Sequence, residues 1–160
     1  MLFVNKFKLY NMREIKVDSN WHFPKTRRTD FSKEEMLDII DFYLQYKPML
    51  DEYVLNNVHY PEFDPHDFTM LLYMYKMVDV DYINNWENLL KKYGKTNVEG
   101  ASKEKLDFLE IITVFTTIHR VSRNDIGDET YDYCVKHNIY YNLLCRLEEI
   151  KKELETNSKL

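Results

Sequence analysis

The sequence predicts a mainly α-helical, compact single domain of about six or seven helices, preceded by a basic N-terminal segment that is extended or forms a short β-hairpin. Three observations support this fold class. From residue 31 onward, apolar residues recur at spacings of three and four, the period of an amphipathic helix. Capping residues stand at the ends of these stretches. The 160 residues are 44% apolar, enough for one domain with its own core.

Three segments divide the chain. Residues 1–30 form the basic N-terminal segment, residues 31–155 the helical domain, and residues 156–160 a tail that should fray. Residues 1–18 partly alternate between apolar and charged side chains, which suggests one or two short strands. The rest of the N-terminal segment has no period and is expected to be a loop.

Residues 31–57 are predicted to form two helices. Ser32, with Glu35 three residues later, is a capping-box start. Pro48 breaks the first helix and opens the second, because proline is tolerated only in the first turn. The second helix ends at Asn56 and the asparagine that follows it.

Two further helices are predicted before residue 95. The first follows Asp64 and Pro65, a pair typical of a helix start. Because it is apolar nearly all round, it is expected to be central and buried. The next helix is capped by Asp79 or Asp81 and ends at Gly94.

The C-terminal part is predicted to contain three helices. After a linker, a long helix runs from Ser102 toward Arg120. A short helix follows Gly127, and Asn138 suits the left-handed turn that ends it. The last helix, residues 139–154, has a strong apolar stripe and is expected to bury it in the core.

The net charge of −5 is unevenly distributed. Residues 1–28 carry seven lysines and arginines against Glu14 and Asp18, a net charge of +5, which leaves −10 for the remainder. Such a segment can contact nucleic acid, an acidic partner, or the protein's own acidic surface, and the last is the favoured interpretation. If it binds nucleic acid, the expected contact residues are Lys6, Lys8, Arg13, Lys25, Arg27 and Arg28.

Composition also predicts the compartment. The apolar runs are only a handful of residues long, too short to span a membrane. The N-terminus contains Lys6 and Lys8 and no small-residue cleavage site, so no signal peptide is expected. Cys134 and Cys145 make no disulfide framework. We therefore expect a reduced, cytoplasmic protein with no membrane partner.

The C-terminal half resembles a known family. A helix ending in "FTTIHRVSR" is followed by a glycine loop, a short helix, a turn and "IYYNLLCRLEEI", and "INNWENLLKKYG" lies upstream. Over roughly residues 65–150 this order resembles domain of unknown function 6508, a family of small bacterial proteins. The resemblance implies a helical fold and no particular activity, because the family has none assigned. The matching positions are Phe115, Thr116, Arg120, Arg123, Gly127, Leu143, Leu144, Arg146 and Leu147.

The stretch "TTIHRVSRNDIGD" contains the candidate ligand-binding residues, His119, Arg120 and Arg123. The two arginines are one helical turn apart and share a face. A guanidinium group offers a planar fork of donors, so the pair can grip a phosphate or a carboxylate. The favoured alternative is structural, since cations at a helix C-terminus stabilise its dipole and bond its last carbonyls. In that case the expected carboxylate partners are Asp125, Asp128 or Asp132.

No metal, cofactor or catalytic residue is predicted. One group of potential metal ligands is formed by Cys134, His137 and Cys145, but it lacks a CxxC pair and a fourth ligand. "HYPEFDPHD" supplies a second group, which helix capping and loop polarity already explain. His119 has no adjacent serine or cysteine to activate. The sequence contains no phosphate-binding glycine loop and no metalloprotease motif.

The favoured function is a non-enzymatic protein-interaction or regulatory module, whose partner is another protein or a second copy of the chain. Thirteen tyrosines, many beside acidic residues, suit a surface that binds a basic protein, although core packing and codon usage are the favoured explanation for them. Nucleic-acid binding through the N-terminal segment is the first alternative. An enzyme with a site near Arg120 and Arg123 is the second.

Overall fold

The structure is a computed structural model that describes residues 25–56, 60–61, 64, 66–125 and 129–157. Within these ranges the chain forms eight helices and no strand, so the mainly α-helical fold class is confirmed. The predicted hairpin in residues 1–18 lies outside the described residues. The helices are α2 (Lys33–Leu44), α3 (Lys47–Asn56), α4 (His66–Met74), α5 (Tyr82–Tyr93), α6 (Val98–Ser102), α7 (Phe108–Ser122), α8 (Glu129–Lys136) and α9 (Ile139–Asn157).

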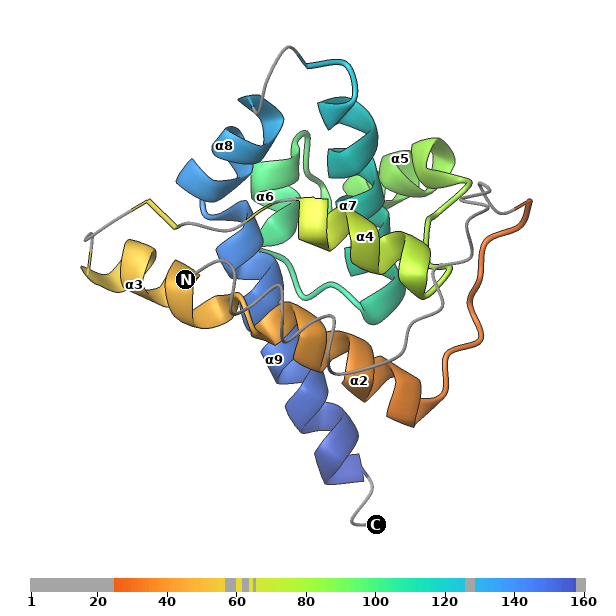
Figure 1. Ribbon diagram of the computed structural model, residues 1–160. Helices are drawn as coiled ribbons and strands as arrows, with labels where there is room; N and C mark the ends of the chain where they lie inside the picture. The colour runs from red at the N-terminus through yellow and green to blue at the C-terminus, as the bar shows by residue number, and fades with distance from the viewer. Residues whose placement is uncertain (1–24, 57–59, 62–63, 65, 126–128, 158–160) are drawn as a thin grey trace.

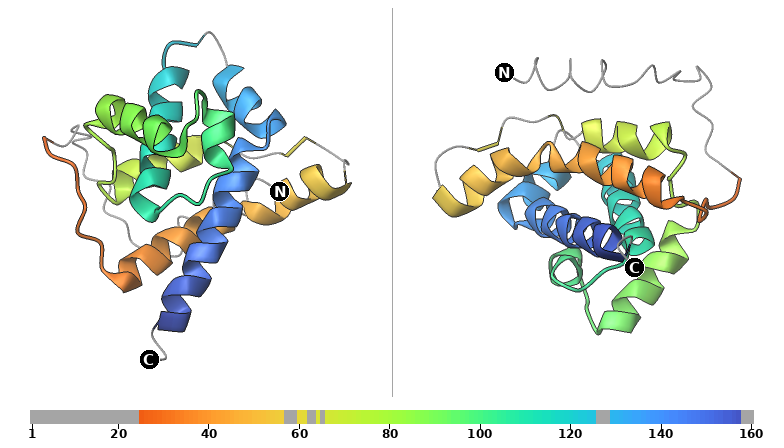
Figure 2. Two further views of the ribbon diagram at one scale, coloured as in Figure 1. Left: turned by 180° about the vertical axis from the view of Figure 1, so that it is seen from behind. Right: turned by 90° about the horizontal axis from the view of Figure 1, so that it is seen from below.

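Helices α7 and α9 organise the fold (Figure 1). Against α9 pack α2, α3, α6, α7 and α8, while α4, α5 and α8 pack against α7. Seen from below, α2 and α3 follow one another along one side of α9 (Figure 2). The last turns of α9 extend beyond the other helices, and the helix continues to Asn157, two residues into the tail that was predicted to fray.

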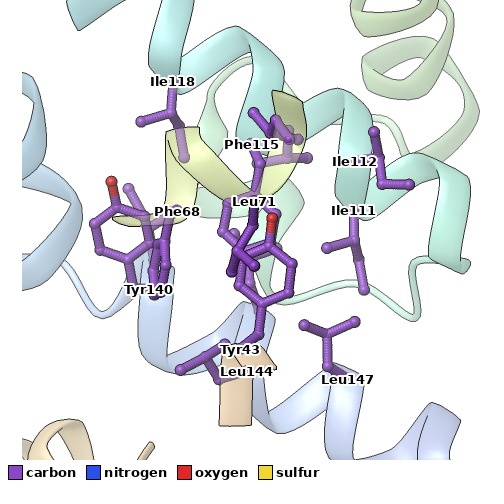
Figure 3. Packing of buried hydrophobic residues seen from close by; sticks show 14 of the residues in the cluster. Tyr43, Phe68, Leu71, Ile111, Ile112, Phe115, Ile118, Tyr140, Leu144 and Leu147 are labelled. Carbon is purple, nitrogen blue, oxygen red and sulfur yellow. The ribbon is translucent and has the colours of Figure 1, made fainter. Parts of the chain in front are cut away.

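The core lies where α2, α4, α7 and α9 meet (Figure 3). Tyr43 of α2 stacks on Phe115 of α7, with ring centroids 4.7 Å apart and planes within 4°. Phe68 of α4 meets Tyr140 of α9 edge-on at 5.0 Å. Leu144, in the stripe of the last helix, is fully buried, which confirms that this face belongs to the core.

Helix α4 has one buried face and one partly buried face. It buries Phe68, Leu71 and Leu72 against the core, whereas Thr69 and Tyr73 on its other side are only partly buried. The two hydroxyl-bearing side chains contact His119 of α7 instead. Helix α4 therefore lies in the core with one face, as expected, while its other side packs along α7 and is only partly buried.

Local capping sets several helix ends as predicted. The Ser32 hydroxyl accepts a hydrogen bond from the backbone N–H of Glu35 at 3.1 Å and starts α2. Gly94, with φ of 64°, ends α5, and Asn138, with φ of 59°, makes the left-handed turn between α8 and α9. These ends depend on contacts within a few residues, which is why the sequence predicts them.

The start of the long helix α7 differs from the prediction. Ser102 ends α6, a short helix that the sequence pattern did not indicate, and α7 begins only after Asp107. Asp107 and Glu110 form a capping box, in which each side chain accepts a hydrogen bond from the other's backbone N–H at 2.8 and 3.0 Å. Arg146 of α9 donates a hydrogen bond from Nε to the carbonyl oxygen of Leu106 at 2.7 Å. This bond holds the connection between α6 and α7 in place.

Candidate functional site

The three candidate ligand-binding residues lie at the C-terminal end of α7, beside α4 and the start of α5. The His119 ring is held between two hydroxyl groups of α4: its Nδ1 is 3.4 Å from Thr69 Oγ1, and its Nε2 is 3.2 Å from the Tyr73 hydroxyl. The Arg120 guanidinium carbon lies 5.8 Å from the centre of the Tyr82 ring, the first residue of α5. Two of the three side chains are thus positioned by residues from other helices.

Burial and charge keep His119 neutral. Desolvation lowers its pKa to about 4, and the positive charges of Arg123, Arg120 and His66 act in the same direction. All the charges that act on this ring from described residues are basic. We call His66, His119, Arg120 and Arg123 the α7 basic cluster. At neutral pH its two arginines supply the fixed positive charge, and the neutral ring can donate or accept a hydrogen bond.

Two of the three carboxylates expected to pair with the arginines, Asp125 and Asp132, make hydrogen bonds to other residues. Asp125 accepts a hydrogen bond from the backbone N–H of Thr130 at 2.8 Å and so caps α8. Asp132 accepts a hydrogen bond from the Tyr60 hydroxyl, and Asp128 lies outside the described residues. Arg123 is exposed, and among the described residues it makes no hydrogen bond or ion pair. Among the described residues, Arg123 is therefore not paired with Asp125 or Asp132, two of the three carboxylates that were expected to hold it.

A cleft of about 450 Å³ opens beside the same end of α7. Ile118 and Cys134 are buried at its base, and Trp86, Val98 and Tyr133 contribute to its walls. Val121 at its edge is 50% exposed and Tyr133 is 42% exposed. The side chains come from α5, α6, α7 and α8, so the cleft exists only in the folded chain. Sequence analysis did not single out this group of residues.

The charged residues that line the cleft, Asp125 and Glu129, are both acidic. Thr117 and Thr130 add hydroxyl groups beside them. Burial raises the pKa of the Cys134 thiol to about 12, so the thiol is protonated and unreactive at neutral pH. The cleft therefore offers apolar surface with negative charge at one side and no activated nucleophile.

Two of the residues proposed to contact nucleic acid are bonded to the protein itself. Arg27 donates from Nη2 to the Leu109 carbonyl at 2.8 Å, and its Nη1 lies 3.6 Å from the carboxylate of Asp79. Arg28 donates to the Tyr75 carbonyl at 2.8 Å and pairs with Glu35. For these two residues, the expectation that the basic segment lies on the acidic body is confirmed. Lys25 is exposed, and Lys6, Lys8 and Arg13 lie outside the described residues.

Asp79, which the sequence indicated only as a helix cap, is the centre of a buried polar cluster. Its side chain is fully buried and accepts hydrogen bonds from the Thr113 hydroxyl at 2.7 Å and the Asn85 amide at 3.0 Å. It also accepts one from the backbone N–H of Asp81 at 3.0 Å, just before α5. This cluster joins Arg27, α5 and α7. No local sequence pattern predicts this polar cluster, because its members are far apart in the sequence.

Among the described residues, the potential metal ligands are not brought together. Within the described ranges, no group of three histidine, cysteine or carboxylate side chains could hold a metal ion. His137 lies 3.3 Å from the carboxylate of Glu99, and Cys134 is buried in the core. His59 and Glu62 of the second group lie outside the described residues. In the part of the chain that the structure describes, no helix is both long and apolar enough to cross a membrane.

Comparison with known proteins yields no match: no family model matches the chain, and no curated protein or solved structure is significantly similar to it. The resemblance to domain of unknown function 6508 therefore stays a prediction.

Proposed function

We propose that this protein is a non-enzymatic interaction module that binds a segment of a partner protein in the cleft between α5, α6, α7 and α8. The observation that carries the proposal is the cleft itself. Its volume of about 450 Å³ falls in the range of ligand sites. Apolar side chains such as Val121 and Tyr133 stay exposed at its edge, and exposed apolar surface around a hollow marks interaction sites.

The charge of the cleft indicates what kind of segment it takes. Because Asp125 and Glu129 are the charged residues of the lining, the complementary partner carries an apolar anchor side chain next to lysine or arginine. The apolar anchor supplies affinity when it leaves water, and the opposite charges orient the segment and speed its approach. The partner is therefore expected to be a basic, amphipathic peptide segment.

The two alternative functions, an enzyme and a nucleic-acid-binding protein, receive less support. Two hydroxyl groups approach the His119 ring, Thr69 Oγ1 at 3.4 Å from Nδ1 and the Tyr73 hydroxyl at 3.2 Å from Nε2, but a pKa lowered to about 4 makes this ring a weak general base at neutral pH. The cleft supplies no activated nucleophile, because its Cys134 thiol is protonated. For nucleic-acid binding, Arg27 and Arg28 already bond to the body. An acidic cleft also repels phosphates.

Tryptophan fluorescence tests this proposal directly. Trp86 lines the cleft, and Trp21 is the only other tryptophan in the sequence, so a Trp21→Phe chain carries a single reporter. We would titrate it with a nonapeptide library that has a fixed central leucine or phenylalanine, in one set with lysine flanks and in the other with glutamate flanks. A blue shift of the emission that saturates only with the lysine-flanked set is expected, because a bound apolar side chain removes water from the indole ring.

Two matched variants localise the binding. Val121→Asp places a charge at the edge of the cleft and should weaken the best peptide by about tenfold or more. Ile83→Asp changes an equally apolar residue that is 60% exposed but does not line the cleft, and it should leave the affinity unchanged. Equal affinities of the two variants, or no peptide with a Kd below about 100 µM, would overturn the proposed function.

A further inference from the structure

The cleft suits a basic, amphipathic segment, and the chain itself contains one. Residues 1–10, "MLFVNKFKLY", hold seven apolar side chains, two lysines and no acidic residue. Residues 11–24, which follow them, include Glu14 and Asp18. The charged residues of the cleft lining are both acidic. The first ten residues are therefore the part of the N-terminal segment that best complements the cleft in charge and in apolar character.

We propose that residues 1–10 bind in the cleft of their own chain and compete there with the partner segment. This inference rests on the proposed function, because it assigns a second occupant to the same cleft. Phe3 and Phe7 supply the apolar anchors, since aromatic side chains bury large areas when they leave water. The two lysines that flank Phe7 complement the carboxylates of Asp125 and Glu129.

The N-terminal segment is attached to the helix that lines the cleft. Arg27 donates hydrogen bonds to the Leu109 carbonyl at 2.8 Å and to the Thr113 hydroxyl at 3.1 Å, which fixes this part of the segment beside α7. Thr117 and Val121 of the same helix line the cleft. They follow Thr113 by one and two turns, about 6 and 12 Å further along the helix axis. The point of attachment is thus close to the cleft.

Residues 11–26 are long enough to join this attachment point to the cleft. A chain of that length spans up to about 55 Å when it is extended and roughly 20 Å on average as a flexible coil. Both lengths exceed the two turns of α7 that separate Thr113 from Val121. The surplus lets the chain pass around α5, which packs against α7.

Attachment to the same chain makes a weak contact sufficient. A flexible linker gives the attached segment an effective concentration of about 1 mM. If residues 1–10 bind as a free peptide with a Kd of about 0.3 mM, they occupy the cleft in roughly three quarters of the molecules. An external segment then binds about fourfold more weakly than it would to an empty cleft. Self-occupancy thus reduces the response to weak or scarce partners.

The fluorescence of Trp86, which lines the cleft, reports whether the cleft is occupied. The measurement uses the full chain with Trp21→Phe as the parent, and we call the same chain with Phe3→Ser and Phe7→Ser the open variant. The emission of the open variant should lie to the red of the parent emission and be quenched more easily by acrylamide. The reason is that water reaches the indole ring once the segment has left the cleft.

A matched control places the effect in residues 1–10. Ile15→Ser with Val17→Ser also removes two apolar side chains from the N-terminal segment, and this control should keep the emission of the parent. Circular dichroism checks that all three chains are folded. The best lysine-flanked peptide should bind the open variant about fourfold more tightly than it binds the parent or the control. Its emission shift should also be larger, because more clefts are empty at the start.

The free peptide of residues 1–10 tests the segment itself. Added to the open variant, it should restore the emission of the parent and saturate with a Kd of about 0.3 mM. The same peptide with Lys6→Glu and Lys8→Glu should bind at least tenfold more weakly. The emission of the parent should not change with protein concentration. A red shift on dilution would mean that a second copy supplies the segment, and it would overturn binding within one chain.

The failure of this inference can be told apart from the failure of the proposed function. If the lysine-flanked peptide binds the parent and the open variant with equal affinity, and their emissions coincide, the chain does not occupy its own cleft. The inference is then overturned, while the proposed function stands. If no peptide binds either chain, both are overturned. A fourfold gain in affinity that accompanies the red shift supports both.

Discussion

Asp79 shows how strongly a single side chain can depend on distant residues. Its carboxylate is fully buried, faces Arg27, and accepts hydrogen bonds from Thr113 and Asn85. A buried charge is tolerated only when it is paired and hydrogen-bonded. The N-terminal segment therefore contributes one partner of an ion pair that the helical body needs.

We predict that Asp79→Ala lowers the free energy of unfolding by about 3–5 kcal/mol, because it leaves the Arg27 guanidinium and several buried donors without their acceptor. Urea denaturation measures the loss. Asp81→Ala is the control, since Asp81 is the exposed N-cap of α5 and its side chain makes no capping hydrogen bond. That variant should stay within about 0.5 kcal/mol of the wild type. Similar losses in the two variants would mean that the buried Asp79 cluster contributes no more to stability than an exposed carboxylate does.

His119 predicts a pH dependence of stability. The pKa of its ring is about 4 in the folded protein and about 6.5 in an unfolded chain. Between these values the unfolded state binds more protons, so stability falls as the pH falls from about 6.5 to about 4. The loss is complete below the folded value, because the ring is then protonated in both states.

The variant His119→Gln should show a flatter stability curve over this pH range. Urea denaturation of both proteins at several pH values between 7 and 4 makes the comparison. Hydrogen bonds and nearby positive charges lower the pKa values of Glu110 and Glu153. Their contribution to stability is lost at lower pH, and it is lost equally in the wild type and in the variant. Parallel curves for the wild type and the variant would contradict the assignment of a neutral His119.

At the scale of elements, the last helix has two parts with different roles. Leu143, Leu144 and Leu147 are buried against α2 and α7, whereas the final turns extend past the other helices (Figure 1). Arg146, only 8% exposed, lies between these parts, and its Nη1 donates to Glu149 and Glu153 one and two turns later. The same arginine bonds to the Leu106 carbonyl and so couples α9 to the start of α7.

We predict that Leu144→Ala lowers the free energy of unfolding by about 2–5 kcal/mol, because it leaves a cavity in a close-packed core. Leu154→Ala is the comparison on the same helix. Leu154 is only partly buried near the end of α9, so its loss should be clearly smaller. Chemical denaturation of the two variants measures the difference. A loss below about half a kcal/mol for Leu144→Ala would mean that this face of α9 is not part of the core.

At the scale of the whole molecule, charge is distributed between a basic N-terminal segment and an acidic remainder. Arg27 and Arg28 show how the described part of that segment is used, since both bond to the helical body. The same body carries the acidic cleft and the α7 basic cluster, both formed in part by residues near the C-terminal end of α7. Groups of opposite charge therefore lie near one end of a single helix.

This distribution predicts weak binding to nucleic acid. At about 150 mM salt, the affinity for DNA or RNA should be weaker than about 10 µM, as for non-specific binding, and removal of residues 1–24 should change it little. Fluorescence anisotropy with labelled oligonucleotides over a range of salt concentrations provides the measurement. Submicromolar binding that disappears on this truncation would restore nucleic acid as the favoured partner.

The helices themselves were largely predictable from the sequence. Their apolar spacing, the Ser32 cap, Gly94 and Asn138 act through contacts of three to five residues, and such contacts form in the same way wherever the segment lies. The neighbouring residues His119, Arg120 and Arg123 were found together for the same reason. The residues of α4 and α5 that contact this site, such as Tyr73 and Tyr82, were missed. They lie far from His119 and Arg120 in the sequence, and no sequence pattern indicates that they are close in space.

Where neighbouring residues offered two choices, only the tertiary structure decided between them. Ser102 and Asp107 can each cap a helix, and the connection held by Arg146 from α9 makes Asp107 the start of α7. Arg27 can bind a phosphate or a carboxylate, and the position of Asp79 makes it a structural residue. Local hydrogen bonds determine which segments are helical, whereas the packing of distant faces determines which polar groups are buried, and so which of them remain available to bind a ligand.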